Sequence, residues 1–213
     1  KTPIFNIQGY LETLLDGGIE DPNINYKFLQ KANDNVERIS KIVEDLVFIS
    51  LSESGQLKLK KENFNIYNLV QKVYADLEEE TKKKNIKLVF DNNLYQNIPV
   101  NADESRIYQV LHNLIQNAIK YCPSGTKVKT SFSDIGNHIL VEINDNGDGI
   151  AEEHLPHLYE RFYRTDHSRN RSEGGTGLGR AIVKHSVEAH GQTVSVRSKV
   201  GKGTVFGFTL DKG

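Results

Sequence analysis

The first part of the chain has the apolar spacing of two amphipathic helices. Apolar residues recur at steps of three and four from Ile4 to Leu14, and the pair Gly17-Gly18 follows where a helix would end. After a turn near Asp21-Pro22, a second periodic segment runs from about Ile24 to Leu51. Its apolar residues alternate steps of three and four, like the seam of a coiled coil: Val36, Ile39, Val43 and Leu46. The pattern predicts a helical hairpin.

The apolar stripe of this hairpin predicts a partner. Two helices cannot bury a continuous apolar stripe by themselves, so we expect a second copy of the chain and a homodimer built on a four-helix bundle. The alternative is that the hairpin packs on the rest of its own chain.

From about Phe64 the pattern changes to helices mixed with short strands. Helices are predicted over 67–84, 104–121 and 178–190, and strands over 87–90, 99–100, 128–133, 139–144, 194–198 and 205–210. Hairpin connections between strands favour a two-layer α/β sandwich over a parallel doubly wound sheet. We therefore expect an α+β chain, with the helical hairpin at 1–55, a linker at 56–63 and the sandwich domain at 64–213.

Composition and charge exclude several classes of function. The 213 residues hold 27 Lys+Arg against 28 Asp+Glu, so no basic field favours nucleic acid. The single cysteine, Cys122, allows neither an internal disulfide nor a multi-cysteine zinc site. No apolar run has the length of a membrane span, and no signal peptide pattern opens the chain. Because methionine is absent and Lys1 stands within an apparent helix, we expect a soluble, cytosolic fragment of a longer protein.

The segment 113–121 carries a polar face on a predicted helix. Asn113, Asn117, Lys120 and Tyr121 fall on one side at steps of three and four. Amide oxygens suit Mg²⁺, which keeps waters beside substrate phosphates, and an ammonium group one turn away can neutralise phosphate charge. The face fits a nucleoside triphosphate, and a solvated amide face on an ordinary helix is the alternative.

The segment 145–150, with the sequence DNGDGI, directly follows a predicted strand. A carboxylate fixed at a strand end can accept a hydrogen bond from an exocyclic amine such as that of adenine, and glycines let a flat ring approach the backbone. A plain Asn-Gly or Asp-Gly turn is the alternative. A calcium loop is excluded, because the later glycine and the glutamate at its twelfth position are missing.

The segment 174–179, with the sequence GGTGLG, opens the last predicted helix. Glycines before a helix N-terminus expose unpaired N–H groups to an anion. The glycine spacing at 175, 177 and 179 does not fit the dinucleotide fingerprint, and the GKGT sequence at 201–204 does not fit the P-loop.

Taken in order, these segments resemble the sequence boxes of bacterial sensor histidine kinases. NLIQNAIKY resembles the N box, DNGDGI the G1 box, ERFYR at 160–164 the F box, GGTGLG the G2 box and GKGT the G3 element. The opening Lys1-Thr2-Pro3 is similar to the end of the H box, and 51–55 to the end of the second dimerisation helix. The phosphate-regulon sensors are the most similar subgroup. The resemblance implies an ATP-binding domain of the histidine kinase, gyrase and Hsp90 type.

The resemblance also implies roles for individual residues. Asn113 and Asn117 would hold Mg²⁺, while Lys120 and Arg164 would contact the phosphates of ATP, Arg164 at the γ-phosphate. The residues next to the adenine and the rest of the nucleotide would be Tyr121, Asp145, Gly147, Gly149 and Thr204. Residues 163–174, with Arg169 and Arg171, would form a mobile lid, and the groups closing on the phosphates would be Gly175, Gly177, Leu178 and Gly179.

Related ATPases of this fold carry a glutamate four residues before the metal-binding asparagine, where it activates water. Here that position is Asn113, and an amide is not a useful general base. The substitution favours transfer of the phosphoryl group to a protein over rapid ATP hydrolysis.

The phospho-accepting histidine of the H box would stand three positions before Lys1, so we expect this chain to bind nucleotide without phosphorylating itself. None of its seven histidines has an H-box context. Thr2 matches a position that orients water when the response regulator is dephosphorylated. The implied protein is the cytoplasmic core of a kinase that serves a response regulator receiver domain and is anchored at the cell membrane through a preceding region.

Arg180 departs from the family pattern, which usually places an apolar residue after the last G2 glycine. It is either an exposed helix position or an extra cation near the phosphates.

Overall fold

The computed structural model describes residues 2–91, 96–164 and 176–213. Contacts within the chain divide it into two compact units, Lys1–Ser50 and Leu51–Gly213.

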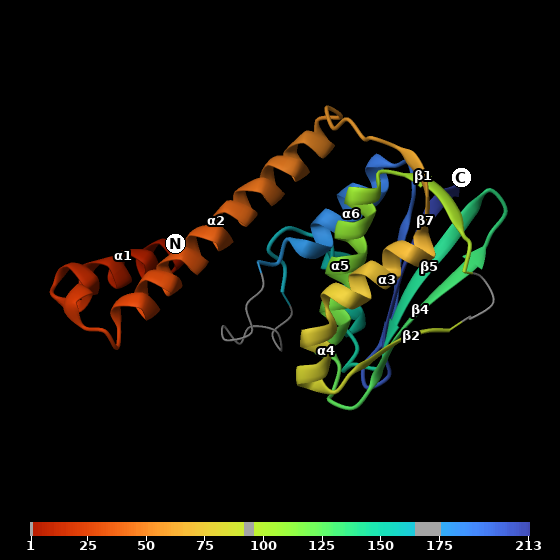
Figure 1. Ribbon diagram of the computed structural model, residues 1–213. Coiled ribbons are helices and arrows are strands. Elements are labelled where there is room, and N and C mark those ends of the chain that lie inside the picture. The colour runs from red at the N-terminus through yellow and green to blue at the C-terminus, as the bar shows by residue number, and fades with distance from the viewer. Residues whose placement is uncertain (1, 92–95, 165–175) are drawn as a thin grey trace. The chain divides into compact units, whose positions relative to one another are not determined.

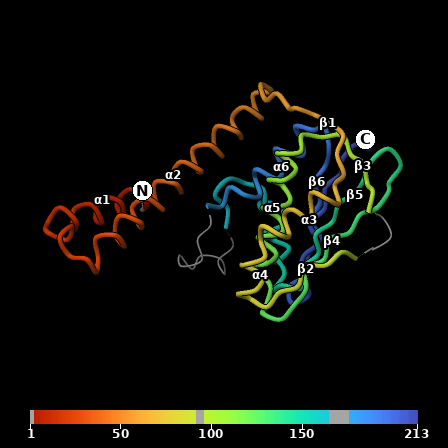
Figure 2. Tube along the Cα trace, viewed as in Figure 1, coloured from red at the N-terminus to blue at the C-terminus, as the bar shows by residue number. Residues whose placement is uncertain are grey.

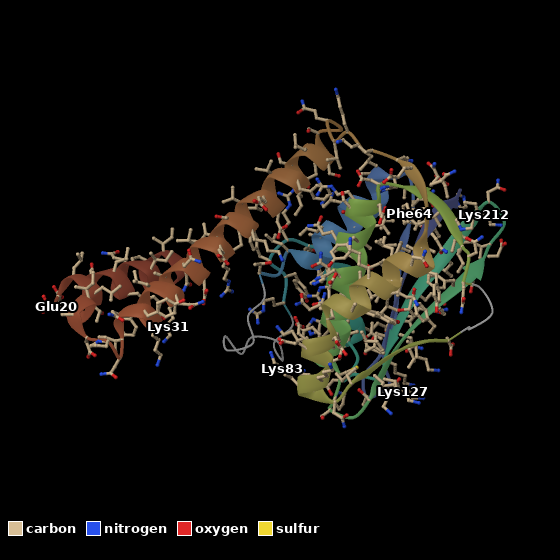
Figure 3. All side chains as sticks on the ribbon, viewed as in Figure 1. Glu20, Lys31, Phe64, Lys83, Lys127 and Lys212 are labelled. Atoms are coloured by element: carbon tan, nitrogen blue, oxygen red, sulfur yellow. The ribbon has the colours of Figure 1, made fainter. Side chains whose placement is uncertain are left out.

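The first unit is a helical hairpin, as its apolar spacing predicts (Figure 1). Helix α1 (Thr2–Leu15) is followed by a short 3₁₀ turn, η1 (Gly18–Glu20), and by the long helix α2 (Asn25–Glu53). Gly17 has a φ of 102°, a left-handed conformation that glycine adopts without strain and that reverses the chain. The rings of Tyr10 and Phe28 lie 5.4 Å apart and join the two helices. The ammonium of Lys31, a residue labelled in Figure 3, lies over both rings.

The second unit contains one mixed sheet. Among the described residues its strands are β1 (Glu62–Asn65), β2 (Lys87–Phe90), β3 (Pro99–Ala102), β4 (Lys127–Asp134), β5 (His138–Asp145), β6 (Val194–Lys199) and β7 (Gly203–Lys212). The strand order is β1-β3-β7-β5-β4-β2, and β6 also pairs with β7 (Figure 2). All pairs are antiparallel except β2 with β4. This arrangement confirms the expected sandwich with a mainly antiparallel sheet.

Four α-helices cover one face of this sheet in Figure 1: α3 (Ile66–Asp76), α4 (Glu78–Lys84), α5 (Glu104–Tyr121) and α6 (Gly179–Ala189). A short 3₁₀ segment, η2 (Glu152–His157), follows β5. The core lies between helices and sheet, where α5 contributes Leu111, Leu114 and Ile115 and β5 contributes Val141 and Ile143. Alternation along β5 places every second residue in this layer, and the same register buries Asp145 at the strand end.

Two local predictions were wrong. The helix expected over 67–84 is broken at Leu77, which ends α3 and begins α4. The separate helix α4 has Glu78, Glu79 and Glu80 in its first turn and lysines in its last, a distribution that complements the helix dipole. The segment Glu62–Asn65, placed at the junction of linker and domain, forms strand β1 through pairing with β3.

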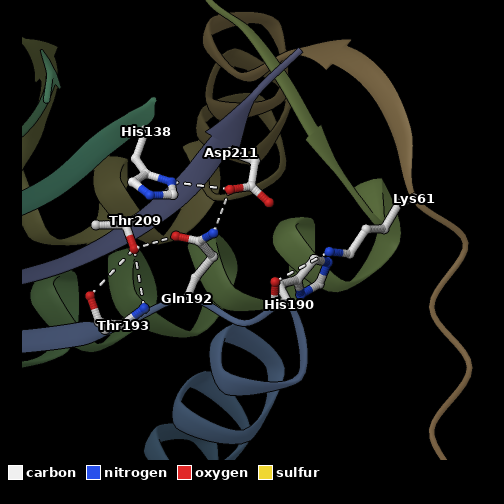
Figure 4. A network of polar contacts seen from close by, with 7 residues as sticks. All are labelled: Lys61, His138, His190, Gln192, Thr193, Thr209 and Asp211. Atoms are coloured by element: carbon white, nitrogen blue, oxygen red, sulfur yellow. Dashed lines mark hydrogen bonds and ion pairs between the residues drawn. The ribbon is translucent and has the colours of Figure 1, made fainter. Parts of the chain in front are cut away.

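A buried histidine joins the end of α6 to the start of α5. The Nδ1 atom of His190 lies 2.7 Å from the Ser186 carbonyl, and the Asp103 N–H donates to Nε2 at 2.9 Å. A carbonyl only accepts and an N–H only donates, so the neutral ring with its proton on Nδ1 satisfies both partners. Lys61 donates to the His190 carbonyl, which ties the segment before β1 to the same point (Figure 4).

Gln192 extends this network to strand β7 (Figure 4). Its amide nitrogen donates to Asp211 at 2.7 Å, and its amide oxygen accepts from the Thr209 hydroxyl at 2.7 Å. The exit of α6 is therefore held by specific polar contacts in addition to apolar packing.

The neutral state of His190 predicts a pH-dependent stability. Burial lowers the pKa of His190 from its ordinary value of 6.5, against the smaller opposing effect of the Ser186 carbonyl. As the pH falls, the imidazole therefore gains its second proton at a higher pH in the unfolded chain than in the folded one. At pH values under about 6.5 the free energy of unfolding should decrease, by up to about 1.4 kcal/mol per pH unit. Urea unfolding between about pH 5 and pH 8 measures the slope. His190→Gln should flatten it and the exposed control His157→Gln should not; equal slopes in both variants would contradict the assignment.

Candidate functional site

The polar face of α5 forms one side of the candidate site. Asp103 caps the helix N-terminus by accepting from the Arg106 N–H, and the opposite, apolar face is buried in the core. Asn113, Asn117 and Lys120 are half-buried. Tyr121 ends the helix with 37% of its surface exposed, and the Lys120 ammonium lies 5.4 Å from its ring centroid. The helix thus places two amides, one cation and one aromatic ring in the order that the sequence predicts.

Asp145 is the buried acid of the site. Its Oδ1 accepts from the Gly147 N–H at 2.8 Å and from the Thr204 N–H at 3.2 Å. Burial raises the pKa of the Asp145 carboxyl, and these two hydrogen bonds oppose the rise. Among the described residues no hydrogen bond is directed to Oδ2. The second oxygen is therefore available to accept from a bound donor.

Glycines allow three segments to meet around Asp145. A Cβ on Gly147 would lie 2.7 Å from the Tyr121 carbonyl oxygen, so this loop rests against the end of α5. A Cβ on Gly203 would collide with the Asp145 backbone. A Cβ on Gly149, which has a φ of 71°, would likewise collide with the Lys199 carbonyl. These contacts bring Asp145, Thr204 and the backbone of Tyr121 at the end of α5 together.

Ser198 also supports this arrangement, although the sequence did not suggest it. Its hydroxyl oxygen accepts from the Ile150 N–H at 2.8 Å and lies 2.9 Å from the Thr204 hydroxyl. A serine in an alternating strand gives no signal of its own, because only the sheet register brings Ser198 opposite Thr204.

The start of α6 forms the other side of the site. A Cβ on Gly179 would lie 3.0 Å from the Asn113 side-chain oxygen, so the absence of a side chain lets the helix start approach the amide of α5. Gly177 has a φ of 74° and lies against the Phe162 backbone. Leu178 is fully buried, so its side chain anchors this turn.

The segment 160–164 lies beside this helix start. The Tyr163 hydroxyl and His154 Nδ1 are 2.8 Å apart, and the Tyr163 carbonyl accepts from Arg180 at 3.2 Å. Arg164 is half-buried.

Some predicted residues lie outside the described part of the chain. Gly175, Arg169 and Arg171 are among them, as is most of the proposed lid. Thr2 begins α1 in the other unit, and its side chain is not described.

Comparisons with known proteins decide the family. Residues 102–213 match the family described as histidine kinase-, DNA gyrase B-, and HSP90-like ATPase. The chain belongs to this family. Residues 1–55 match the His Kinase A (phospho-acceptor) domain, so the chain carries both domains of a histidine kinase core. The resemblance to sensor histidine kinases and the expected fold class are confirmed.

Individual histidine kinases match nearly the whole chain. Sensor histidine kinase WalK of Bacillus subtilis (strain 168) is 35% identical over 216 residues, which cover 99% of this chain and 34% of WalK. Acinetobacter baumannii histidine kinase AdeS is 30% identical with a TM-score of 0.79, and the match covers 100% of this chain and 96% of that one. Histidine kinase ThkA in complex with response regulator protein TrrA is 27% identical with a TM-score of 0.70, over 99% of this chain and 58% of that one. The chain spans about a third of the length of the curated relatives it matches.

Two further properties characterise this histidine kinase core. Within its described residues, no group of three or more His, Cys, Asp or Glu side chains could hold a metal ion. A divalent cation at this site would therefore need amide oxygens and oxygens of the ligand, which fits the amides of α5.

None of the described helices has the length and apolar character required to cross a bilayer.

A matched pair of glycines tests the packing around Asp145. Gly149 and Gly201 have nearly equal φ values of 71° and 73°, but only a Cβ at 149 meets another backbone segment. Gly201→Ala should cost about 1 kcal/mol of stability for the strained φ alone. Gly149→Ala should cost about 3 kcal/mol or more, because the loop must also move away from Lys199. Urea unfolding of both variants gives the difference, and equal losses would contradict the close approach.

Proposed function

We propose that this chain is the core of a two-component sensor histidine kinase that binds Mg-ATP. In the whole protein, the γ-phosphoryl group would pass to the phospho-accepting histidine, which the family resemblance places three positions before Lys1 and so outside this chain. An aspartate of a response regulator would then receive it from that histidine. The observation that carries the proposal is the buried Asp145 carboxylate, held by two backbone N–H groups beside the end of the amide-bearing helix α5.

The surroundings of Asp145 favour adenine as the base. Oδ2 can accept from the exocyclic amine of adenine, whereas guanine would place a carbonyl oxygen against the carboxylate and be repelled. Gly147 and Gly149 let the backbone at Tyr121 and Lys199 pack closely around the acid, and the Thr204 N–H donates to it. These contacts support the role that the family resemblance implies for Asp145, and they bring the other four residues that it implies close to the acid.

Asp145→Asn tests base recognition. The variant is isosteric and keeps an oxygen for the Gly147 and Thr204 N–H groups, but its amide nitrogen then faces the amine of adenine. The affinity for Mg-ATP should fall about tenfold or more, the effect of losing a hydrogen bond to a charged group. Titration calorimetry measures this change.

The matched control is Asp148→Asn, an exposed position in the same loop, which should bind Mg-ATP like the unmodified chain. Burial raises the pKa of Asp145, so its carboxyl takes up a proton at a pH above the ordinary pKa of 3.8. As the pH falls, ATP binding should therefore begin to weaken above pH 3.8. Equal affinities of the two variants would contradict the role of Asp145.

The phosphate side of the site would be formed by α5 and the segment before the lid. Asn113 and Asn117 would supply amide oxygens to Mg²⁺, which neutralises charge on the phosphates when it is bound. Lys120 and Arg164 would contact phosphate oxygens, and Gly175, Gly177, Leu178 and Gly179 would lie along the chain of phosphates through their backbone. The fit rests on the approach of Gly179 to the Asn113 oxygen and on the donor types present.

Asn117→Ala tests the metal assignment. Loss of one oxygen ligand should weaken ATP binding about tenfold in the presence of Mg²⁺ and much less when EDTA removes the metal. Asn137→Ala, on the exposed turn between β4 and β5, is the matched control and should have no effect. Equal losses with and without Mg²⁺ would assign Asn117 a role other than metal binding.

The chemistry proposed for this site is transfer to a protein. A histidine nitrogen attacks the γ-phosphorus, the bond to the β–γ bridging oxygen breaks, and ADP leaves; a carboxylate oxygen of the receiver domain then takes the phosphoryl group from the histidine. Asn113 cannot remove a proton from water, so the geometry offers no general base for hydrolysis at that position. Positioning and charge neutralisation would supply the rate enhancement.

The hairpin is proposed to form a homodimer through its coiled-coil seam. Val36 and Val43 lie on the predicted seam and are 48% and 53% exposed in the single chain. A row of exposed apolar side chains on a two-helix unit fits a second copy of the same hairpin. We further propose that a response regulator receiver domain is the second partner, since ThkA forms such a complex. Thr2 would then assist dephosphorylation of that partner.

Because ATP is a substrate available in the cytoplasm, we place the core there. Anchoring at the cytoplasmic face of the cell membrane, through a region outside this chain, completes the proposal.

A further inference from the structure

Arg180 is the second residue of α6, and it is not the exposed helix position that one interpretation of the sequence offered. The residue is half-buried, and its guanidinium donates to the Tyr163 carbonyl at 3.2 Å. It therefore bridges the start of α6 and the segment 160–164.

In the part of the chain that the structure describes, no Asp or Glu forms an ion pair with Arg180. Arg164 is a second cation within electrostatic range of it. The side chains of Tyr121, Tyr159 and Tyr163 are within electrostatic range of the guanidinium. Burial raises the pKa of Tyr159 to about 12, so this phenol is uncharged at neutral pH and cannot balance Arg180.

The position of Arg180 in the first turn of α6 adds to the local excess of positive charge. A cation in the first turn of an α-helix faces the positive end of the helix dipole and is unfavourable there without an anion. Burial of the guanidinium is a further cost, which also lowers the pKa of Arg180. The helix end and Arg180 thus produce one local positive field.

The same field adjoins the groups assigned to the nucleotide. Gly179, directly before Arg180, lies against the Asn113 oxygen, and Tyr121 at the end of α5 is within electrostatic range of the guanidinium. We propose that Arg180 binds the phosphate groups of the nucleotide as a cation additional to Lys120 and Arg164. This proposal rests on the proposed ATP site and adds a residue that the family pattern does not provide.

Arg180→Leu tests the proposal, since an apolar residue is the usual one here in similar kinases. The affinity for Mg-ATP, measured by calorimetry, should fall about tenfold or more. The affinity for adenosine, measured by NMR titration, should stay within about twofold, because adenosine has no phosphate. Arg180→Lys keeps the positive charge but lacks the planar guanidinium. Its affinity for ATP should therefore lie between those of the unmodified chain and of Arg180→Leu.

Arg197→Leu is the matched control. It removes an arginine from strand β6 whose guanidinium pairs with Glu142 and is 73% exposed, and it should leave both affinities unchanged. An unchanged ATP affinity in Arg180→Leu, or an equal loss for ATP and adenosine, would overturn the proposal. Failure of the unmodified chain to bind Mg-ATP would instead overturn the proposed function itself.

Discussion

The structure of the ATP-binding unit depends on the burial of one carboxylate. Asp145 ends the central strand β5 in the register that faces the helices, where an isolated charge would be costly. The N–H groups of Gly147 and Thr204 reduce that cost. The Thr204 N–H can approach Oδ1 because Gly203, next to it, has no side chain that would meet the Asp145 backbone. The sheet register thus buries the Asp145 carboxylate, and the glycine-rich loops supply the N–H groups that stabilise its charge.

Much of this unit could be predicted from the sequence, because the decisive signals are local. The helix at 104–121 and the strand at 139–144 have clear apolar periodicity, and the order of the glycine-rich segments points to the family. The strand β1 could not be predicted: the sequence Glu-Asn-Phe-Asn has no apolar alternation and becomes a strand only by pairing with β3. The break at Leu77 has a signal, since the charges of 78–84 suit a separate helix, but continuous apolar spacing concealed it.

The site shows the same division between local and long-range information. Asn113, Asn117 and Asp145 could be found because residue type and spacing suggest their chemistry. Ser198 could not, since its role depends on the sheet register that brings it opposite Thr204. For Arg180 the sequence left two interpretations open, and only the burial of the residue and its contact with Tyr163 exclude an exposed position. A hydroxyl or a guanidinium has many uses, and only tertiary contacts select among them.

The edges of the sheet have a consequence for how this protein associates. The described strands at its two ends, β1 and β2, are each only four residues long. Short edges expose few free N–H and C=O groups, so they are poor templates for adding strands from another molecule. Among the described strands, β6 also has an unpaired edge, since it pairs only with β7, and it is six residues long. With all three edges this short, copies of the protein at high local concentration should have little tendency to form intermolecular β-structure.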